Sequence, residues 1–213
     1  MSLLEKSDFY EFVSGDEAEL WGKRHYGEWA ENYKNGVFHL QKINDDFGWD
    51  VIKCYCGQMH DHINTILRKA ETNYLATDTY ELMSRMLAVV IALAPRVPED
   101  IIVYRGVFKA ELDELQNMIK EGSPLYKEDF VSTSLCTEIT KTNKFDALLR
   151  IRLCKGVAGI YASLVAGDRC EYELLLLPRC FIGKFDKSTK KCFKSHEKIN
   201  DCPVYDCDLT YML

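Results

Sequence analysis

The spacing of apolar residues changes near Pro95 and Pro98. Before these prolines, apolar residues recur every three or four positions, as in 63–70, which predicts helices. After them, short runs rich in β-branched and aromatic residues are bounded by glycine, proline and polar residues, which predicts strands. We therefore expect an α+β fold, in which a mainly helical part (1–98) packs on a mostly antiparallel β core (99–213). No flexible linker separates the two parts, so we expect one domain.

Capping and turn residues place the individual elements. Helices are expected from residue 15 to residue 21 or beyond, over 80–94 and over 109–121, and the last two end at proline or glycine. In the predicted strand 147–153, Arg150 and Arg152 share one face, and we expect them to be surface charges, although one of them could reach a ligand. The predicted strands are 101–104, 130–135, 147–153, 157–164, 172–177, 181–185 and 204–212.

Net charge and hydropathy exclude several classes of protein. The net charge is −6 and no basic stripe is present, so nucleic acid is not an expected partner. The longest apolar run, 87–94, has eight residues, whereas a membrane-spanning helix needs about 20. The N-terminus lacks the basic and apolar regions of a secretory signal. We expect no membrane insertion and a protein that acts in the cytosol, reached by a signal-peptide-independent route if it is secreted.

Nine cysteines are scattered along the chain. They do not form the dense framework of small disulfide-rich domains, so we expect mostly reduced thiols. Cys54 and Cys56, followed by His60 and His62, are residue types that bind zinc, but their spacing differs from that of the common zinc modules. The alternative is that these residues serve helix packing or lie at the surface, and we expect no metal.

Two glutamates precede a run of four leucines in the stretch GDRCEYELLLLP (167–178). The run is typical of a buried strand, in which residues i and i+2 share a face about 7 Å apart. Glu171 and Glu173 would then present their carboxylates side by side, with Tyr172 on the opposite face. Paired carboxylates can break a glycosidic bond, because one stabilises the oxocarbenium-like transition state while the other handles the nucleophile. The alternative is charge that protects a strand edge from aggregation.

Two further motifs have side chains suited to a nucleotide. Arg105 follows a short strand and can bind phosphate with two hydrogen bonds, while Gly106 allows a ligand to approach the backbone closely. Ser132, Thr133 and Ser134 lie in an otherwise apolar strand, and their hydroxyls can orient a carboxylate and a ribose. The alternatives are a surface arginine at a turn, and hydroxyls that cover a half-exposed strand.

The order of these motifs resembles the R-S-E class of mono-ADP-ribosyltransferase toxins, in the group that contains the clostridial Rho-modifying exoenzymes and the actin-modifying binary toxins. Each motif alone is weak, but all of them occur in order and at workable spacing over most of the chain. The resemblance implies a helical cap on two packed β-sheets. The motifs are AELWG (18–22) with Tyr26 and Trp29, INTILR (63–68), PEDIIVYRG (98–106), FVSTSL (130–135), LRIRLCKG (149–156) and EYELLL (171–176).

The resemblance also implies catalytic roles for the glutamates. Glu173 would bind a hydroxyl of the nicotinamide ribose and stabilise the oxocarbenium ion, and Ser132 would hold Glu173 in place. Glu171 would position the acceptor and help to deprotonate it. Family members with glutamate at this position modify arginine, whereas the Rho-modifying members have glutamine there and modify asparagine. Glu171 therefore predicts a protein substrate with an acceptor arginine.

NAD is the substrate that the resemblance implies. Arg105 would hold it near the phosphates and the nicotinamide ribose, and Arg68 near the diphosphate. The turn 165–170 would recognise the protein substrate, but it lacks the aromatic residue common in the family, so actin is not predicted as the target. The full set of expected NAD contacts is Arg105, Gly106, Arg68, Ser132, Thr133, Ser134 and Glu173.

The expected function is therefore NAD-dependent ADP-ribosylation of a protein arginine in another cell, as a toxin or effector. Two alternatives stay open at this point. An NAD glycohydrolase would use the same site with water as the acceptor, and a non-catalytic binding module would have kept only the fold. We expect a monomer, with a delivery or immunity partner if the protein is a toxin.

Overall fold

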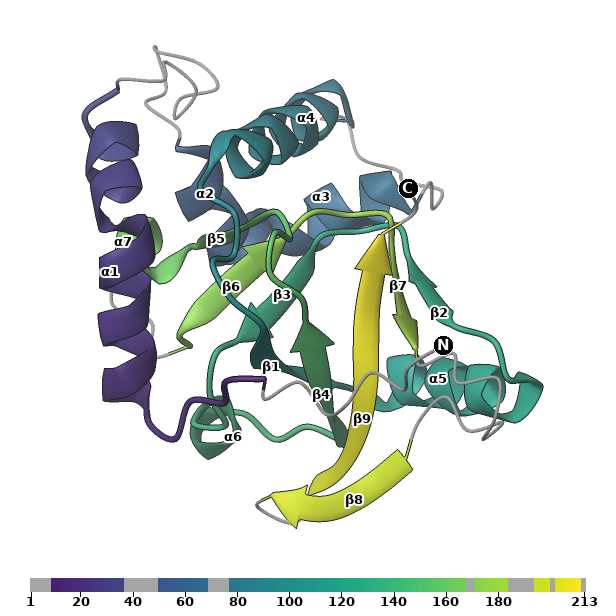
Figure 1. Ribbon diagram of the computed structural model, residues 1–213. Helices are drawn as coiled ribbons and strands as arrows, with labels where there is room; N and C mark the ends of the chain where they lie inside the picture. The colour runs from purple at the N-terminus through teal and green to yellow at the C-terminus, as the bar shows by residue number, and fades with distance from the viewer. Residues whose placement is uncertain are drawn as a thin grey trace, which may run out of the picture.

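Helices form most of the N-terminal part of the chain, and strands are the main regular structure in the rest (Figure 1). The computed structural model describes residues 9–36, 50–68, 77–167, 171–183, 194–199 and 202–211. A π-helical segment, Tyr55–Met59, joins the second helix to the third. The N-terminal helices are α1 (Gly15–Lys34), α2 (Val51–Cys54), α3 (His60–Leu67) and α4 (Thr77–Leu93). The predicted helical part is thus confirmed.

Capping and burial explain the length of α1, which runs far beyond residue 21. The Ser14 hydroxyl accepts a hydrogen bond from the Glu17 backbone N–H, which satisfies one of the free donors at the start of the helix. Tyr33, in the last turn, is fully buried, so packing extends the helix to its end. The aromatic residues of the motif in this helix are buried: Trp21, Tyr26 and Trp29.

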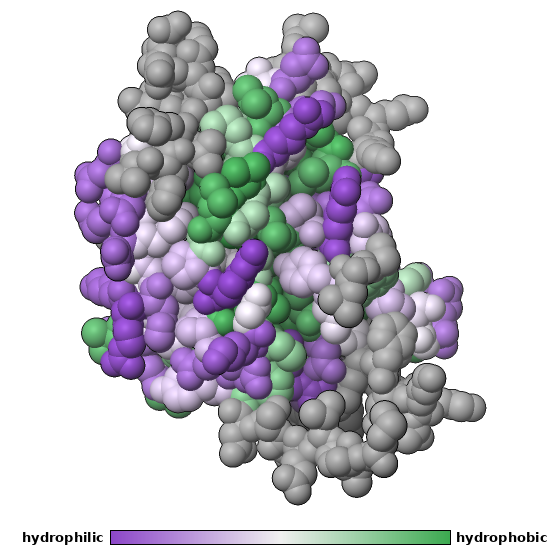
Figure 2. All heavy atoms as spheres, turned by 45° about the horizontal axis from the view of Figure 1, so that its top comes forward, coloured by the Kyte–Doolittle hydropathy of each residue, from purple (hydrophilic) through white to green (hydrophobic). Residues whose placement is uncertain are grey.

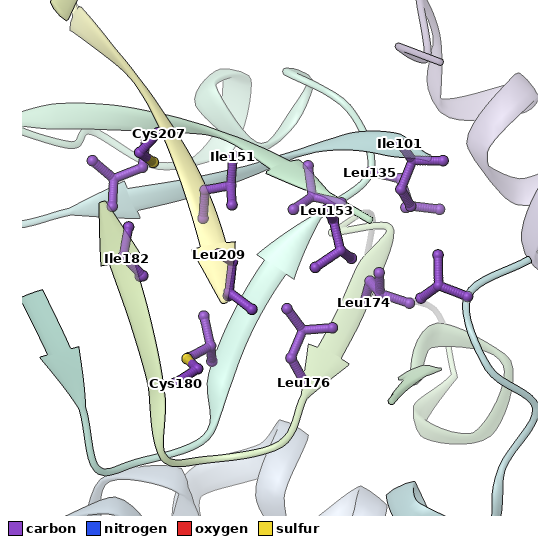
Figure 3. Close-up of a cluster of buried hydrophobic side chains, with 14 of the residues drawn as sticks. Ile101, Leu135, Ile151, Leu153, Leu174, Leu176, Cys180, Ile182, Cys207 and Leu209 are labelled. Atoms are coloured by element: carbon purple, nitrogen blue, oxygen red, sulfur yellow. The ribbon is translucent and has the colours of Figure 1, made fainter. Parts of the chain in front are cut away.

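The strands form one hydrogen-bonded path in the order β2-β7-β9-β4-β1-β3-β6-β5, with β8 beside β9. All neighbours are antiparallel except β4 and β9. β1 pairs with β3 at Tyr104 and Ser134. The strands that precede this pairing in the order, from β2 to β1, form one layer, and β3, β6 and β5 form a second layer packed against it (Figures 1 and 3). The strands are β1 (Ile101–Val107), β2 (Leu125–Lys127), β3 (Val131–Ser134), β4 (Ala147–Leu153), β5 (Gly159–Tyr161), β6 (Glu173–Leu176), β7 (Cys180–Gly183), β8 (Lys194–Ile199) and β9 (Cys202–Tyr211).

Most predicted elements coincide with observed ones, although several strands differ in extent. The strand predicted over 101–104 continues through Arg105 and Gly106 to Val107. The predictions for 109–121 and 147–153 match α5 (Lys109–Glu121) and β4. The segment 157–164 gives only β5, because the chain turns at Ala162 into a short helix, α7 (Ser163–Ala166). The segment 172–177 becomes a strand only at Glu173, because Tyr172 has a left-handed backbone with a φ of 48°.

Short elements escaped prediction. β2 has three residues and the helix α6 (Ile139–Thr142) has four, which is too short for a periodic pattern. β8 is not among the predicted strands, but it pairs with β9. Residues 184–185 and 212, the ends of two predicted strands, lie outside the described ranges.

The parallel pairing of β4 with β9 places the arginines of β4 opposite aspartates. Arg150 lies opposite Asp206, with 3.2 Å between Nη1 and Oδ1, and Arg152 binds Asp208. Arg150 also binds Glu11 of the N-terminal segment. All these side chains are partly exposed, which confirms the prediction of surface charge at the two arginines.

The main core lies between the two layers of strands (Figure 3). A second cluster lies between the helices and the opposite side of β5 and β6, where Leu87 and Ile91 of α4 pack with Ile160 and Leu175. Strand β6 is therefore buried on both faces, as its leucine run predicted. The residues of the main core that Figure 3 labels are Ile101, Leu135, Ile151, Leu153, Leu174, Leu176, Cys180, Ile182, Cys207 and Leu209.

The outer side of α4 is also apolar. Figure 2 brings this side of the molecule forward and shows apolar side chains gathered there. Leu82, Val89 and Leu93 are its large exposed apolar side chains. Within the described ranges, no helix has both the length and the hydropathy needed to cross a membrane.

Two glycines of α1 allow a test of how the helical part docks on the strands. A Cβ atom on Gly22 would lie 2.2 Å from the ring of Tyr161 in β5, whereas a Cβ atom on Gly27 would meet nothing within 4 Å. We expect Gly22→Ala to lower the free energy of unfolding by about 1–3 kcal/mol, because the core would be overpacked. The matched control Gly27→Ala should raise it by about 0.5–1 kcal/mol through helix propensity. Urea unfolding measures both, and equal stabilisation by the two changes would contradict the packing of α1 on β5.

Candidate active site

A buried glutamate and a serine meet where β3 and β6 pair. The register places Ser134 opposite Glu173, and Ser132 opposite Leu175. The Ser132 hydroxyl donates a hydrogen bond of 2.6 Å to Oε1 of Glu173. Only 8% of the Glu173 surface is exposed, although the residue carries a carboxylate. A carboxylate in such a position needs a partner or a task.

The other two hydroxyls of the Ser-Thr-Ser stretch bind backbone atoms. The Thr133 hydroxyl donates to the carbonyl oxygen of Leu174 at 2.7 Å, and the Ser134 hydroxyl donates to the carbonyl oxygen of Cys136 at 2.9 Å. Both side chains are buried. Of the three hydroxyls, the one of Ser132 therefore binds the glutamate, while the other two hold β3 to the segments around it.

The environment of Glu173 disfavours its charged form. Burial raises the pKa of Glu173 above its ordinary value, while hydrogen bonds to Ser132 and Cys56 lower it in part. The negative charge of Glu171 also raises this pKa. The backbone N–H of Glu173 donates to the hydroxyl of Ser163 at 3.0 Å, which fixes the start of β6.

The two glutamates are not arranged as predicted, because a turn precedes β6. Glu171 lies in this turn, and the left-handed Tyr172 follows it, so the alternation of an extended strand does not relate Glu171 to Glu173. The prediction that the two share a strand face is therefore wrong. The ring of Tyr172 packs against Gly15, where a Cβ atom would lie 2.1 Å from its hydroxyl oxygen, and this hydroxyl is 3.4 Å from Glu138. These contacts hold Tyr172 in a backbone conformation that non-glycine residues rarely adopt.

Arg105 of β1 lies beside the serine. Its Nη1 donates to the carbonyl oxygen of Ser132 at 3.1 Å, and its Nη2 lies 3.2 Å from Oε2 of Glu111 in α5. The Arg105 side chain is 17% exposed. Burial alone would lower the pKa of Arg105, but Glu111 raises it, so the guanidinium is charged. Strands β1, β3 and β6 thus bring Arg105, Ser132 and Glu173 together.

Gly106 and Arg68 occupy different settings. A Cβ atom on Gly106 would lie 2.2 Å from the ring of Phe145, so a glycine is needed there for packing. Arg68, which follows α3, is half-exposed and binds the buried Asp129 through Nε and Nη2, at 2.9 and 2.8 Å from Oδ2. Contact of either residue with NAD stays a prediction.

Several residues of this region were missed by the sequence analysis. None belongs to a motif, and only their positions in the fold bring them together. Glu111 is in the first turn of α5, Lys127 ends β2 and Asp129 precedes β3. Tyr55 exchanges hydrogen bonds with Asn64, and burial raises the pKa of Tyr55 strongly.

The two histidines of the possible zinc site contact other groups. Nδ1 of His60 lies 3.2 Å from the carbonyl oxygen of Gly57, and the ring of His62 stacks on Tyr80. No group of three or more potential metal ligands occurs in the described part of the chain. None of the cysteines in the described ranges forms a disulfide. Residues 168–170 of the predicted recognition turn lie outside the described ranges.

Comparison with known proteins gives the family. A family model described as ADP-ribosyltransferase exoenzyme matches residues 18–200. No curated protein matches the chain by sequence.

Solved structures share the fold. The ADP-ribosylating toxin BECa of a C. perfringens binary enterotoxin, determined with NADH, has a TM-score of 0.72 and 18% identity, and the match covers 95% of this chain and 50% of that chain. The ADP-ribosyltransferase toxin Plx2a from Paenibacillus larvae has a TM-score of 0.68 and 16% identity, over 94% of this chain and 98% of that chain. C3stau2 from S. aureus, determined with NAD, has a TM-score of 0.62 and 16% identity, over 97% and 100%. The chain thus spans half the length of BECa, and nearly all of the other two. With a family model matched over most of its length, the chain belongs to the ADP-ribosyltransferase exoenzyme family.

Proposed function

We propose that this chain cleaves NAD at the bond between nicotinamide and ribose and transfers the ADP-ribose to an arginine of a protein. The observation that carries the proposal is the buried carboxylate of Glu173, held by Ser132 at 2.6 Å. Arg105 binds the backbone of the same serine. Two solved structures of the same fold contain NAD or NADH, which supports NAD as the substrate.

The chemistry needs a fixed negative charge. As the glycosidic bond breaks, positive charge develops on the ribose, and a carboxylate held in place beside it stabilises the transition state. Ser132 fixes Glu173 through its hydrogen bond to Oε1. Arg105 supplies a guanidinium suited to a phosphate oxygen. No metal is needed for any of these steps.

Glu171 accounts for the choice of acceptor in this proposal. It lies in the turn that precedes β6, where a carboxylate can accept the proton of an incoming guanidinium. The protein substrate would bind next to this turn, in a host or competitor cell. The chain would act as one ADP-ribosyltransferase domain, with residues 1–98 as the helical cap and 99–213 as the catalytic β core.

Labelled NAD tests the proposal. Wild type, Glu171→Gln and Glu173→Gln are incubated with NAD, with and without a host-cell lysate, and free nicotinamide and protein-bound label are measured separately. We expect wild type to label a lysate protein, Glu173→Gln to lose both signals, and Glu171→Gln to release nicotinamide without labelling. These substitutions separate the cleavage of NAD from the transfer of ADP-ribose, because each removes the charge of one glutamate and keeps the shape of its side chain.

Other outcomes would redirect the assignment. Equal release of nicotinamide with and without lysate, and no labelled protein, would make the chain an NAD glycohydrolase. A label that hydroxylamine does not remove would contradict arginine as the acceptor. A wild-type protein that neither cleaves NAD nor labels a protein would be a binding module that kept the fold.

A further inference from the structure

An alternating row of charged side chains joins two arginines of the candidate site. Nη2 of Arg68 lies 2.8 Å from Oδ2 of Asp129, and Oδ1 of the same carboxylate lies 3.5 Å from Nζ of Lys127. The same Nζ lies 3.0 Å from Oε1 of Glu111, and Glu111 binds Arg105. The two ends of the row are the arginines expected to contact NAD, and its three inner members belong to no motif in the sequence.

We propose that Glu111 and Lys127 are positioning residues, which hold the guanidinium of Arg105 in the orientation that binds a phosphate of NAD. This inference rests on the proposed function, because it names further residues of the same site. Neither residue is expected to touch the reacting atoms.

Glu111 fixes the plane of the Arg105 guanidinium. Nε and Nη2 of Arg105 lie 3.4 and 3.3 Å from Oε1 of Glu111, and Nη2 lies 3.2 Å from Oε2. The remaining nitrogen, Nη1, donates to the carbonyl oxygen of Ser132. The guanidinium is thus held on two sides, and one of them is the residue whose hydroxyl holds Glu173. An arginine fixed in this way loses less conformational freedom when it binds a ligand.

Lys127 keeps Glu111 in place and balances its charge. The Lys127 side chain is only 11% exposed, and its ammonium group lies between the carboxylates of Glu111 and Asp129. Burial alone would raise the pKa of Glu111, but Arg105 and Lys127 together lower it, so the carboxylate stays ionised. The row contains three cations and two anions. Its excess positive charge favours a diphosphate even though every cation in it already has a carboxylate partner.

The helix α5 supports the position of Glu111. This helix follows β1 after a single residue, Phe108, so Glu111 lies six positions after Arg105 and turns back toward it. It is in the first turn, where the helix dipole stabilises a negative charge. Asp113 lies in the same helix but points to solvent, where it binds Lys109. It offers a matched control, since its loss removes the same charge from the same helix.

Steady-state kinetics of nicotinamide release test the inference. We expect Glu111→Gln to raise KM for NAD by about tenfold and to change kcat by less than about threefold, because the lost interaction orients a binding group rather than a reacting one. Lys127→Met should also raise KM for NAD. It leaves two complete ion pairs, Arg68 with Asp129 and Arg105 with Glu111, and so keeps the test available if Glu111→Gln does not fold. Asp113→Asn should leave both constants unchanged.

A double-mutant cycle separates positioning from general structural damage. In an Arg105→Lys background, Glu111→Gln should change KM by less than about twofold, because the guanidinium that Glu111 holds is already absent. Full additivity of the two changes would overturn the proposal. So would a lower KM in Glu111→Gln, since Glu111 would then compete with the phosphate for Arg105. If wild type releases no nicotinamide, the proposed function itself fails, and this inference fails with it.

Discussion

Replacing Glu173 by glutamine should reduce nicotinamide release by about 10²- to 10³-fold and, at neutral pH, make the protein more stable. The loss of activity follows from removing a fixed charge that stabilises the transition state, for which factors of this size are typical. The gain in stability follows from burial. Only 8% of Glu173 is exposed, so its charged form is costly in the folded protein. Glutamine keeps the shape and can still accept the hydrogen bond from Ser132.

The effect on stability should depend on pH. Burial raises the pKa of Glu173 in the folded protein, so the folded state binds a proton more tightly than the unfolded state does. The stability that this provides is fully present below the pKa that Glu173 has in the unfolded state. It is lost as the pH rises through the higher pKa that Glu173 has in the folded state. The difference in unfolding free energy between Glu173→Gln and wild type should therefore be larger at about pH 8 than at about pH 5.

Denaturant unfolding at the two pH values measures this difference. Glu114→Gln is a suitable control, because Glu114 is an exposed carboxylate of α5 and its loss should change stability little at either pH. A stability gain that is the same at both pH values would show that Glu173 does not titrate abnormally. If Glu173→Gln lost activity without any gain in stability, the free-energy cost of burying the charged Glu173 carboxylate would be smaller than we expect.

Much of the fold could be predicted from local pattern. The strand β4 and the helix α5 have clear periods and clear ends, so their bounds were predicted correctly. The leucine run of β6 predicted burial on both faces, and Leu174 and Leu175 indeed lie in two different core clusters. These features depend on residues that are neighbours in the sequence, where spacing alone indicates which side is apolar.

Features that depend on distant residues could not be predicted. The left-handed backbone of Tyr172 is stabilised by packing on Gly15, which lies in a helix more than a hundred positions earlier. The parallel pairing of β4 with β9 is fixed by the path of the whole chain. At the site, the motifs placed Arg105, Ser132 and Glu173 together, but Glu111 and Lys127 resemble ordinary surface charges in the sequence. Only the fold shows that they are mostly buried.

Replacing Arg105 by methionine should have the opposite effect on stability to that of Glu173→Gln. Arg105 is 17% exposed, and its loss leaves the Glu111 carboxylate, which is 18% exposed, without one of its two cations. Breaking a buried ion pair from one side typically costs 3–5 kcal/mol, and we expect about 3 kcal/mol here because Lys127 stays bound to Glu111. NAD cleavage should fall as well, through a higher KM, because the phosphate loses its guanidinium.

A matched arginine distinguishes this effect from the loss of any arginine. Arg85 of α4 is 78% exposed and lies 3.4 Å from Glu81, so Arg85→Met should change the unfolding free energy by less than about 0.5 kcal/mol. Arg105→Lys should fall between wild type and Arg105→Met, because lysine keeps the charge but cannot span Ser132 and Glu111 at once. If Arg105→Met changed the unfolding free energy as little as Arg85→Met does, the Arg105 guanidinium would not be paired with Glu111 in solution. If Arg105→Lys were fully active, charge alone would suffice, and the fixed geometry between β1, β3 and α5 would have no part in binding NAD.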